Sequence, residues 1–210
     1  MLELYFTPDT CALASHIALE DAGAEYHLRR IDFDKAEQRS PDYLAVNPKG
    51  RVPALVTERG VLTETPAMLA YVAQSYPAAG LAPLDDPFAF AQVQAFNSYL
   101  CSTLHVAHAH RMRGHRWANE QEAIAAMQRK VPQSVGACYA YIEEQAFIGP
   151  FVMGETYTTA DPYLFTIAQW MEGDGVDPDQ FPKVAEHREM MRLRPSVQAA
   201  LHEEFQEPRT

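Results

Sequence analysis

The sequence has no apolar run approaching the roughly 18 residues that a helix needs to cross a membrane. Its first residues also lack the basic stretch followed by an apolar stretch that marks a secretory signal. From these two absences we expect no membrane span and predict a cytoplasmic location.

Cysteine is scarce, with only three residues in the chain, and they stand far apart at Cys11, Cys101 and Cys138. An odd number at this spacing excludes a disulfide framework and any CxxC metal or redox pair. Each cysteine is therefore predicted to be a free thiol.

Positive charge is also in short supply, because 17 Lys and Arg residues face 28 Asp and Glu residues, for a formal net charge of −11. Binding to nucleic acid or to an anionic membrane needs a basic face, so we expect neither kind of partner. Any anionic ligand must be held by local donors. The 47% of apolar residues in a chain of 210 residues is enough for a sizeable core.

The two halves of the chain differ in pattern. The first half predicts a βαβ unit followed by a ββα unit, with a hairpin turn at Arg59 and Gly60 and a helix that has Thr65 as N-cap and Pro66 as its first residue. The segments of the βαβ unit are strands at 2–6 and 26–32 and a helix at 15–23 between them. The fold class is therefore α/β in the first half.

The second half begins after a segment rich in proline, "PAAGLAPLDDP", whose composition is that of a linker. We divide the chain into domains at 1–77 and 88–210, joined by the linker 78–87. Strand signals almost vanish beyond it, and the second domain is predicted to be all-helical. Its predicted helical segments are 88–112, 120–146, 159–171, 181–193 and 195–205, and Pro132 and Gly136 are expected to kink or break the second of them.

Two local motifs are informative. In "TYTTADPYLF", Thr158 and Asp161 stand three apart and predict a capping box, in which the carboxylate reaches back to the cap's own amide. Asp161 is then structural, and Asp161→Ala should cost roughly 1 to 2 kcal/mol of stability. In "RVPALV", Pro53 lies where a strand begins, which is an allowed position for proline.

Taken alone, the other candidate residues have ordinary interpretations. Cys11 lies between a strand and a helix and is either a packed small hydrophobe or an activated thiol. His105 and His108 are three apart on one helical face, but no thiol or carboxylate pattern completes a metal site, and imidazoles with arginines suit an anion-facing or solvated helix. Cys101 and Cys138 fall in helical patterns and are expected in the core.

The order of several motifs resembles that of the glutathione S-transferases. These motifs are "YFTPDTCALASH", "RVPAL", "LTETPAMLAYVA", the proline-rich linker and "TTADPYLF". The cysteine of the first, the histidine of "STLH" and the tryptophan of "FTIAQW" make the chain similar to the bacterial beta class in particular. The resemblance covers nearly the whole chain. It implies a thioredoxin-like N-terminal domain, a helical C-terminal domain, and a homodimer that binds glutathione between the two domains.

The resemblance also implies roles for individual residues. Cys11 corresponds to the characteristic thiol of the class, and His105 to a helical histidine near it. Pro53 corresponds to a cis-proline, so that the backbone of Val52 can pair with the cysteinyl part of glutathione. The residues that correspond to the rest of the glutathione site are Glu64 and Thr65 at the γ-glutamyl end and the aromatic Trp170 beside the cleft. Thr65 would also open a helix, whose N-terminus suits a carboxylate.

Three positions depart from the family's pattern. Ser98 stands where an asparagine is usual, with Asn97 beside it, and Lys35 is the nearest match to a lysine that follows the second strand. Asp9 occupies a position where glycine is frequent, and a carboxylate turned inward there would raise the pKa of the thiol. We expect Asp9 to point to solvent or to cap the turn, and we expect the pKa of Cys11 to lie below about 8.5.

The functional hypothesis is a glutathione transferase that uses glutathione as co-substrate, with no other cofactor and no metal. Cys11 and His105 are the predicted catalytic residues. The electrophile site is expected on the wall of the helical domain, at Leu104, His108, Met112 and Trp117. If Cys11 only donates a hydrogen bond, the product is a thioether, whereas a Cys11 thiolate would exchange with disulfides. The alternative is a non-catalytic protein that binds glutathione or acts as a regulator with the same fold.

Overall fold

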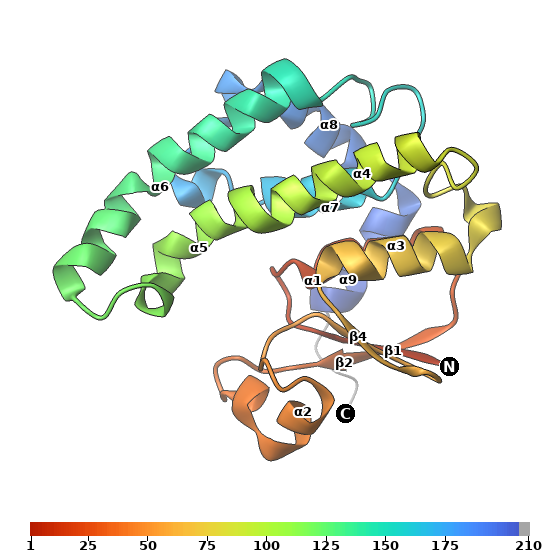
Figure 1. Ribbon diagram of the computed structural model, residues 1–210, viewed down its shortest axis with the longest axis horizontal. Coiled ribbons are helices and arrows are strands. Elements are labelled where there is room, and N and C mark those ends of the chain that lie inside the picture. The colour runs from red at the N-terminus through yellow and green to blue at the C-terminus, as the bar shows by residue number, and fades with distance from the viewer. Residues whose placement is uncertain (206–210) are drawn as a thin grey trace.

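The structure is a computed structural model that describes residues 1–205 (Figure 1). Its first part alternates strands and helices. In chain order they are β1 (Leu2–Phe6), α1 (Ala12–Asp21), β2 (Tyr26–Arg30), α2 (Pro41–Val46), β3 (Ala54–Thr57), β4 (Gly60–Thr63) and α3 (Thr65–Ser75). The remainder of the described chain is mainly helical. Its main helices are α4 (Pro87–Tyr99), α5 (His105–Arg113), α6 (Gln121–Tyr141), α7 (Ala160–Ala168), α8 (Pro182–Arg192) and α9 (Pro195–Phe205).

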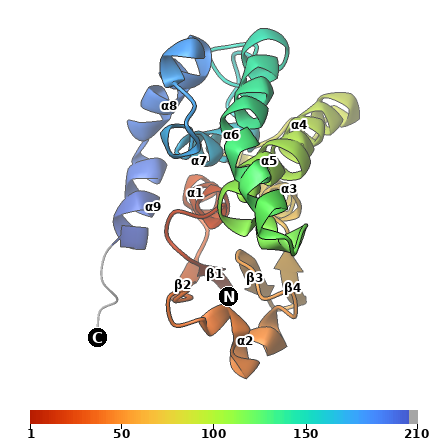
Figure 2. The ribbon, with the colours of Figure 1, turned by 90° about the vertical axis from the view of Figure 1, so that its left-hand side faces the viewer.

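The four strands form one mixed sheet in the order β2-β1-β3-β4. β1 pairs in parallel with β2, while β3 runs antiparallel to both β1 and β4. Helices α1 and α3 cover one face of this sheet, and α2 lies on the other side (Figure 2). This arrangement is the thioredoxin-like architecture that the resemblance implied.

Helix α1 is buried along almost its whole length, from Ala12 to Leu19. It lies between the sheet and the helices of the second half, which pack on its other side (Figure 2). The helix begins three residues before the predicted segment and ends near Gly23, whose φ of +60° suits glycine. A helix that is buried on all sides shows no amphipathic stripe. Accordingly, α1 contains no Asp, Glu, Lys or Arg before Glu20.

The second half differs from the prediction at Pro132. Helix α6 runs without interruption through Pro132 and Gly136 to Tyr141, so neither residue breaks it. A proline inside a helix removes one hydrogen bond, but tertiary packing can offset that cost. Here Val131 and Val135 are buried on the same helix and contribute that packing. The five π-helical residues Leu100–Leu104 likewise join α4 and α5 into one continuous rod.

The first half differs from the prediction in two details. The segment between β2 and β3 contains the short helix α2, which the sequence analysis does not include and which Ser40 caps by accepting from the Tyr43 amide at 3.2 Å. Helix α3 begins at Thr65 itself, so that Glu64, at φ +75°, takes the N-cap position that was predicted for Thr65. Helix boundaries shift by a residue when the cap makes no side-chain hydrogen bond, as at Glu64.

The capping box at the start of α7 is confirmed. The Asp161 carboxylate accepts from the Thr158 amide at 2.7 Å, and the Thr158 hydroxyl accepts from the Ala160 amide at 3.2 Å. Asp161 is fully buried and does more than cap, because it also accepts from the Val152 amide at 2.8 Å and lies 3.0 Å from Nε2 of His187. One carboxylate therefore holds α7, the preceding loop and α8 together.

Helix α9 returns to pack on α1. The apolar contact between them includes Leu13, Ile17, Val197 and Ala200. Beside it, Nδ1 of the buried His16 lies 3.2 Å from a carboxylate oxygen of Glu204. The burial of Glu204 raises the pKa of its carboxyl, which the His16 contact only partly offsets.

Within residues 1–205, one group of side chains has the spacing of metal ligands. The ligand atoms of His16, Glu20 and Glu203 all lie within 4.8 Å of one another, beside the α1–α9 contact. The hydroxyl of Tyr26 forms hydrogen bonds with both His16 and Glu20, so these two side chains are already linked through Tyr26. Among the same residues, no helix combines the length and apolar character needed to cross a membrane.

Candidate active site

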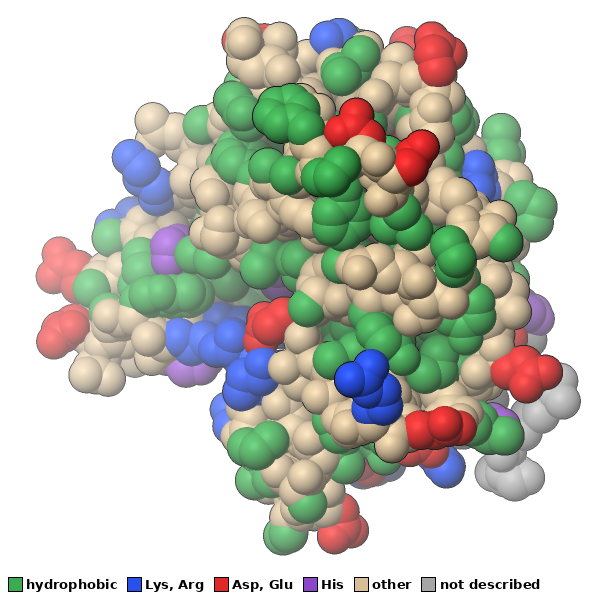
Figure 3. All heavy atoms as spheres, turned by 45° about the vertical axis from the view of Figure 1, so that its right-hand side comes forward, with side chains coloured by type: hydrophobic (Ala, Val, Ile, Leu, Met, Phe, Trp, Pro, Cys, Tyr) green, Lys and Arg blue, Asp and Glu red, His purple; other side chains and the backbone are tan. Residues whose placement is uncertain are grey.

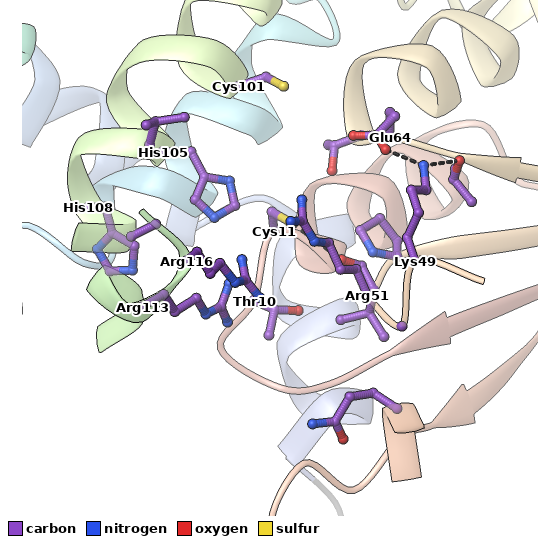
Figure 4. A pocket seen from close by; sticks show the side chains of 18 of the residues that line it. Thr10, Cys11, Lys49, Arg51, Glu64, Cys101, His105, His108, Arg113 and Arg116 are labelled. Atoms are coloured by element: carbon purple, nitrogen blue, oxygen red, sulfur yellow. Dashed lines mark hydrogen bonds and ion pairs between the residues drawn. The ribbon is translucent and has the colours of Figure 1, made fainter. Parts of the chain in front are cut away.

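A pocket of about 410 Å³ lies where α5 and the turn after it overhang the sheet half of the molecule (Figure 4). Its lining comes from both halves: from the turn before α1, from the segments around β3 and β4, and from α5 and α7. This volume falls in the range of small-molecule sites. The pocket is therefore the candidate active site.

Cys11 lies at the start of α1, in the position that the turn "PDTC" predicts, and lines the pocket. The preceding Thr10 shapes this turn, because its hydroxyl donates to the Thr7 carbonyl at 2.7 Å and accepts from the Ala12 amide at 3.3 Å. The sulfur of Cys11 lies 3.9 Å from the Val52 carbonyl oxygen. The thiol therefore faces the strand-starting segment on which an extended peptide would lie.

The prediction of a lowered pKa at Cys11 is wrong. Burial raises the pKa of the thiol to about 11, and the Thr65 hydroxyl and the charge of Arg113 offset this only in part. The helix N-terminus favours a thiolate, but its effect of about 1 kcal/mol is smaller than the cost of removing a charge from water. Cys11 is consequently a neutral thiol, able to donate its S–H.

The segment around Pro53 is arranged as the resemblance implied. The Val52–Pro53 peptide bond is cis, and both residues line the pocket. Glu64 and Thr65 also line it at the N-terminus of α3, where free backbone amides suit a carboxylate. Glu64 is paired with the ammonium of Lys49 from the neighbouring loop, as Figure 4 shows.

His105 and His108 enter the pocket from α5, and their rings pack against Trp170 at centroid distances of 5.1 and 4.3 Å. Burial, with the nearby positive charges, lowers the pKa of His105 to about 3, so its imidazole is neutral. His108 is held by Asp174, whose carboxylate lies 2.7 Å from its Nδ1.

Asp9 lines the pocket and accepts from the indole N–H of Trp170 at 3.1 Å. It is exposed to solvent, as the sequence predicts, and the contact with Trp170 is an addition to that prediction. Its φ of +57° lies in the left-handed region, which explains why glycine is frequent at this position in the family.

Five predicted site residues do not line the pocket. Lys35 is exposed and pairs with Asp32 at 3.0 Å, because the loop after β2 turns back on itself. The remaining four are Asn97, which is buried, Ser98, which is exposed, Leu104, which is fully buried, and Met112, which is 71% exposed. The residues of α5 that do line the pocket are His105, Val106, His108, Ala109 and Arg113.

The sequence analysis missed several residues that line the pocket. Cys101 is half-buried there, not in the core, and therefore places a second thiol in the site. Four arginines also line it: Arg39, Arg51, Arg113 and Arg116. Arg113 and Arg116 belong to the basic stretch "HVAHAHRMRGHR", which can be recognised in the sequence. Arg39 and Arg51 come from the sheet half, and only the fold brings all four arginines together.

This geometry agrees with the comparisons with known proteins. Residues 2–74 match the family model for the glutathione S-transferase N-terminal domain. The chain is 32% identical over 206 residues to the glutathione S-transferase GstA of Escherichia coli O157:H7, which covers 97% of this chain and 98% of that protein.

Solved structures show the same similarity. A crystal structure of a glutathione transferase homolog from Sulfitobacter with bound glutathione matches at a TM-score of 0.94 and 50% identity, covering 97% of this chain and 98% of that one. The bacterial beta class glutathione S-transferase of Sphingomonas chungbukensis matches at a TM-score of 0.79 and 32% identity, with coverages of 97% and 98%. The chain therefore belongs to the glutathione S-transferase family and is a glutathione transferase.

Proposed function

We propose that this enzyme conjugates glutathione to a carbon electrophile, with Cys11 acting as a hydrogen-bond donor and not as a nucleophile. The raised pKa of Cys11 carries this proposal. A neutral thiol can donate its proton to a glutathione thiolate, whereas disulfide exchange needs the cysteine itself ionised.

In this proposal residues 1–77 hold glutathione and residues 88–210 supply the wall for the electrophile. The γ-glutamyl carboxylate takes the amides at the N-terminus of α3 beside Thr65, and Glu64 accepts from the ammonium group. The cysteinyl backbone pairs with Val52 as an added strand. The glutathione sulfur then lies near Cys11 and the neutral ring of His105, which both line the pocket.

The chemical step is a substitution at carbon. The glutathione thiol loses its proton to solvent, and the thiolate is stabilised by the Cys11 S–H and by a ring N–H of His105. The sulfur lone pair then forms the new C–S bond, and the leaving group departs with the electrons of the broken bond. We expect the pKa of bound glutathione to fall below its usual value of about 8.5.

Cys11→Ser and Cys11→Ala test the role of the thiol. Serine keeps a donor at this position, so conjugation should stay within about 3-fold of the parent, whereas alanine should lose about 10-fold or more. Cys138→Ala is the matched control, because that cysteine does not line the pocket. If Cys11→Ser is inactive and oxidised glutathione adds to Cys11 of the parent, the enzyme is a thiol transferase instead.

We further propose a two-fold homodimer, as the family resemblance implies. Large apolar side chains are exposed at Val61 on β4, at Leu84 in the linker and at Phe88 at the start of α4. Phe88 is 74% exposed, which is unfavourable for an isolated subunit. A dimeric mass in light scattering at micromolar concentration, reduced to a monomer by Phe88→Asp, is the expected result, and a monomeric parent would contradict it.

A further inference from the structure

The pocket is positively charged in a protein that is strongly negative. Five cationic side chains line it, Arg39, Lys49, Arg51, Arg113 and Arg116, against the two carboxylates of Asp9 and Glu64. The chain as a whole carries a formal net charge of −11. Figure 3 shows Lys and Arg side chains gathered on one side, where the helical half overhangs the sheet half. Cations are therefore concentrated at the site although the rest of the chain is rich in acids.

The four arginines among these cations are not neutralised by the residues around them. Lys49 pairs with Glu64, and Asp9 accepts from Trp170. In the part of the chain from 1 to 205, by contrast, none of the four guanidinium groups has a carboxylate within ion-pair distance or donates a side-chain hydrogen bond.

The guanidinium groups also repel one another. Desolvation, followed by the charges of Arg113, Arg51 and Arg39, lowers the pKa of Arg116 to about 10. Burial is the largest cause of this shift, and the charges of the neighbouring guanidinium groups lower the pKa of Arg116 further. A bound anion would relieve the repulsion.

Glutathione accounts for only part of this charge. Its γ-glutamyl carboxylate goes to the N-terminus of α3 in the proposed binding mode, which leaves the glycine carboxylate. Arg51 directly precedes Val52, and Arg39 comes from the same half, so these two are placed to receive that group.

Arg113 and Arg116 lie on the other wall. Arg113 is the last residue of α5, and Arg116 belongs to the turn that follows. In Figure 4 both reach into the pocket below His105, while Arg51 enters from the opposite side. Trp117 lines the pocket next to them and offers an aromatic surface. This is the wall at which the electrophile binds.

We propose that the electrophile carries a negatively charged group, a carboxylate or a sulfonate on an aromatic or unsaturated carbon skeleton, and that Arg113 and Arg116 bind that group. This inference rests on the proposed conjugation function and specifies its second substrate. Guanidinium groups bind such oxyanions through paired hydrogen bonds, and the flanking tryptophan packs against the ring. The reacting carbon then lies between this anion site and the glutathione sulfur.

The test compares a charged and an uncharged form of one substrate, 4-chloro-3,5-dinitrobenzoate and its methyl ester. After correction for their uncatalysed rates with glutathione, kcat/KM for the acid should exceed that for the ester by about 10-fold or more, as expected for a hydrogen-bonded ion pair. The Arg113→Gln/Arg116→Gln variant should lose this preference and keep its kcat/KM for the ester within about 3-fold.

A matched control removes the same charge elsewhere. The Arg129→Gln/Lys130→Gln variant changes two exposed cations of α6 that do not line the pocket, and it should retain the preference for the acid. If the control loses the preference equally, general electrostatic steering explains it and the anion site is refuted. Equal rates for acid and ester in the parent, or a rise only in the KM for glutathione in the Arg113/Arg116 variant, would also overturn the proposal.

Binding measurements separate this proposal from the conjugation function. The S-aryl glutathione conjugates of the acid and of the ester are titrated into the parent by calorimetry, which needs no turnover. If neither substrate reacts but the acid conjugate binds about 10-fold more tightly and loses this advantage in the Arg113/Arg116 variant, conjugation fails while the anion site stands. Equal affinity of the two conjugates for the parent refutes the anion site whether or not the substrates react.

Discussion

Replacing Asp161 by alanine should cost far more stability than the loss of a helix cap. The carboxylate is fully buried and accepts from two backbone amides, those of Thr158 and Val152, and it also faces His187. A buried donor left without a partner costs about 1 to 3 kcal/mol, so the two amides alone account for roughly 2 to 6 kcal/mol. We expect a loss of about 4 kcal/mol, above the roughly 1 to 2 kcal/mol that the capping box by itself predicts.

Asp86 provides the matched control for this experiment. It caps α4 by accepting from the Phe88 and Ala89 amides at 2.9 and 3.0 Å, but these contacts are exposed to solvent. Water can replace them, so Asp86→Ala should cost only about 0.5 to 2 kcal/mol. The measurement is urea unfolding of both variants at one protein concentration, because dimerisation would couple stability to concentration. Equal losses for the two variants would refute the account of Asp161, and a stable but inactive Asp161→Ala would assign it to the chemistry.

Three further predictions follow from the pKa values of individual groups. Because the pKa of His105 is about 3, conjugation of a neutral electrophile should show no titration of the His105 imidazole between about pH 5 and 8. An inflection near 6.5 that His105→Asn removes would contradict this. Because the pKa of Cys11 is about 11, iodoacetamide should label this thiol slowly near pH 7.5 and faster as the pH rises. Mass spectrometry follows the labelling, and rapid labelling of Cys11 at neutral pH would show that it is a thiolate. The raised pKa of Glu204 means that its stabilising effect is present at acid pH and is lost as the pH rises through the folded-state value. Glu204→Gln should therefore gain stability relative to the parent as the pH rises above 4.5, the ordinary value of the carboxyl, and a constant difference in thermal unfolding would exclude this linkage.

The helices of the second half could be predicted from the sequence because their apolar periodicity is a local property. The segment 195–205 coincides with α9, and Thr158 and Asp161 form the expected capping box. The sequence predicts a kink or a break at Pro132, and the break does not occur, because the burial of Val131 and Val135 is set by helices distant in sequence. Local propensity indicates where a helix is weak, and tertiary packing decides whether it continues.

In the candidate site too, features set by the local sequence could be predicted, and features set by tertiary packing could not. The motifs around Cys11 and Pro53 predicted residues that do line the pocket, because each motif fixes its own turn. The pKa of Cys11 could not be predicted, since it depends on burial by elements from the rest of the chain. Lys35 was assigned from its position after a strand, but the conformation of that loop pairs it with Asp32.

Helix α9 completes the burial of α1, and this fixes the order in which the protein can mature during synthesis. His16 and Glu204 are 188 residues apart in the chain. At about 5 to 20 residues per second, a ribosome makes the last helix roughly 10 to 40 s after the first. During that interval the apolar side of α1, including Leu13 and Ile17, has no α9 to cover it. A nascent chain stalled before α9 should therefore be a better chaperone substrate than the finished protein, although its sheet and glutathione-binding segments are already complete.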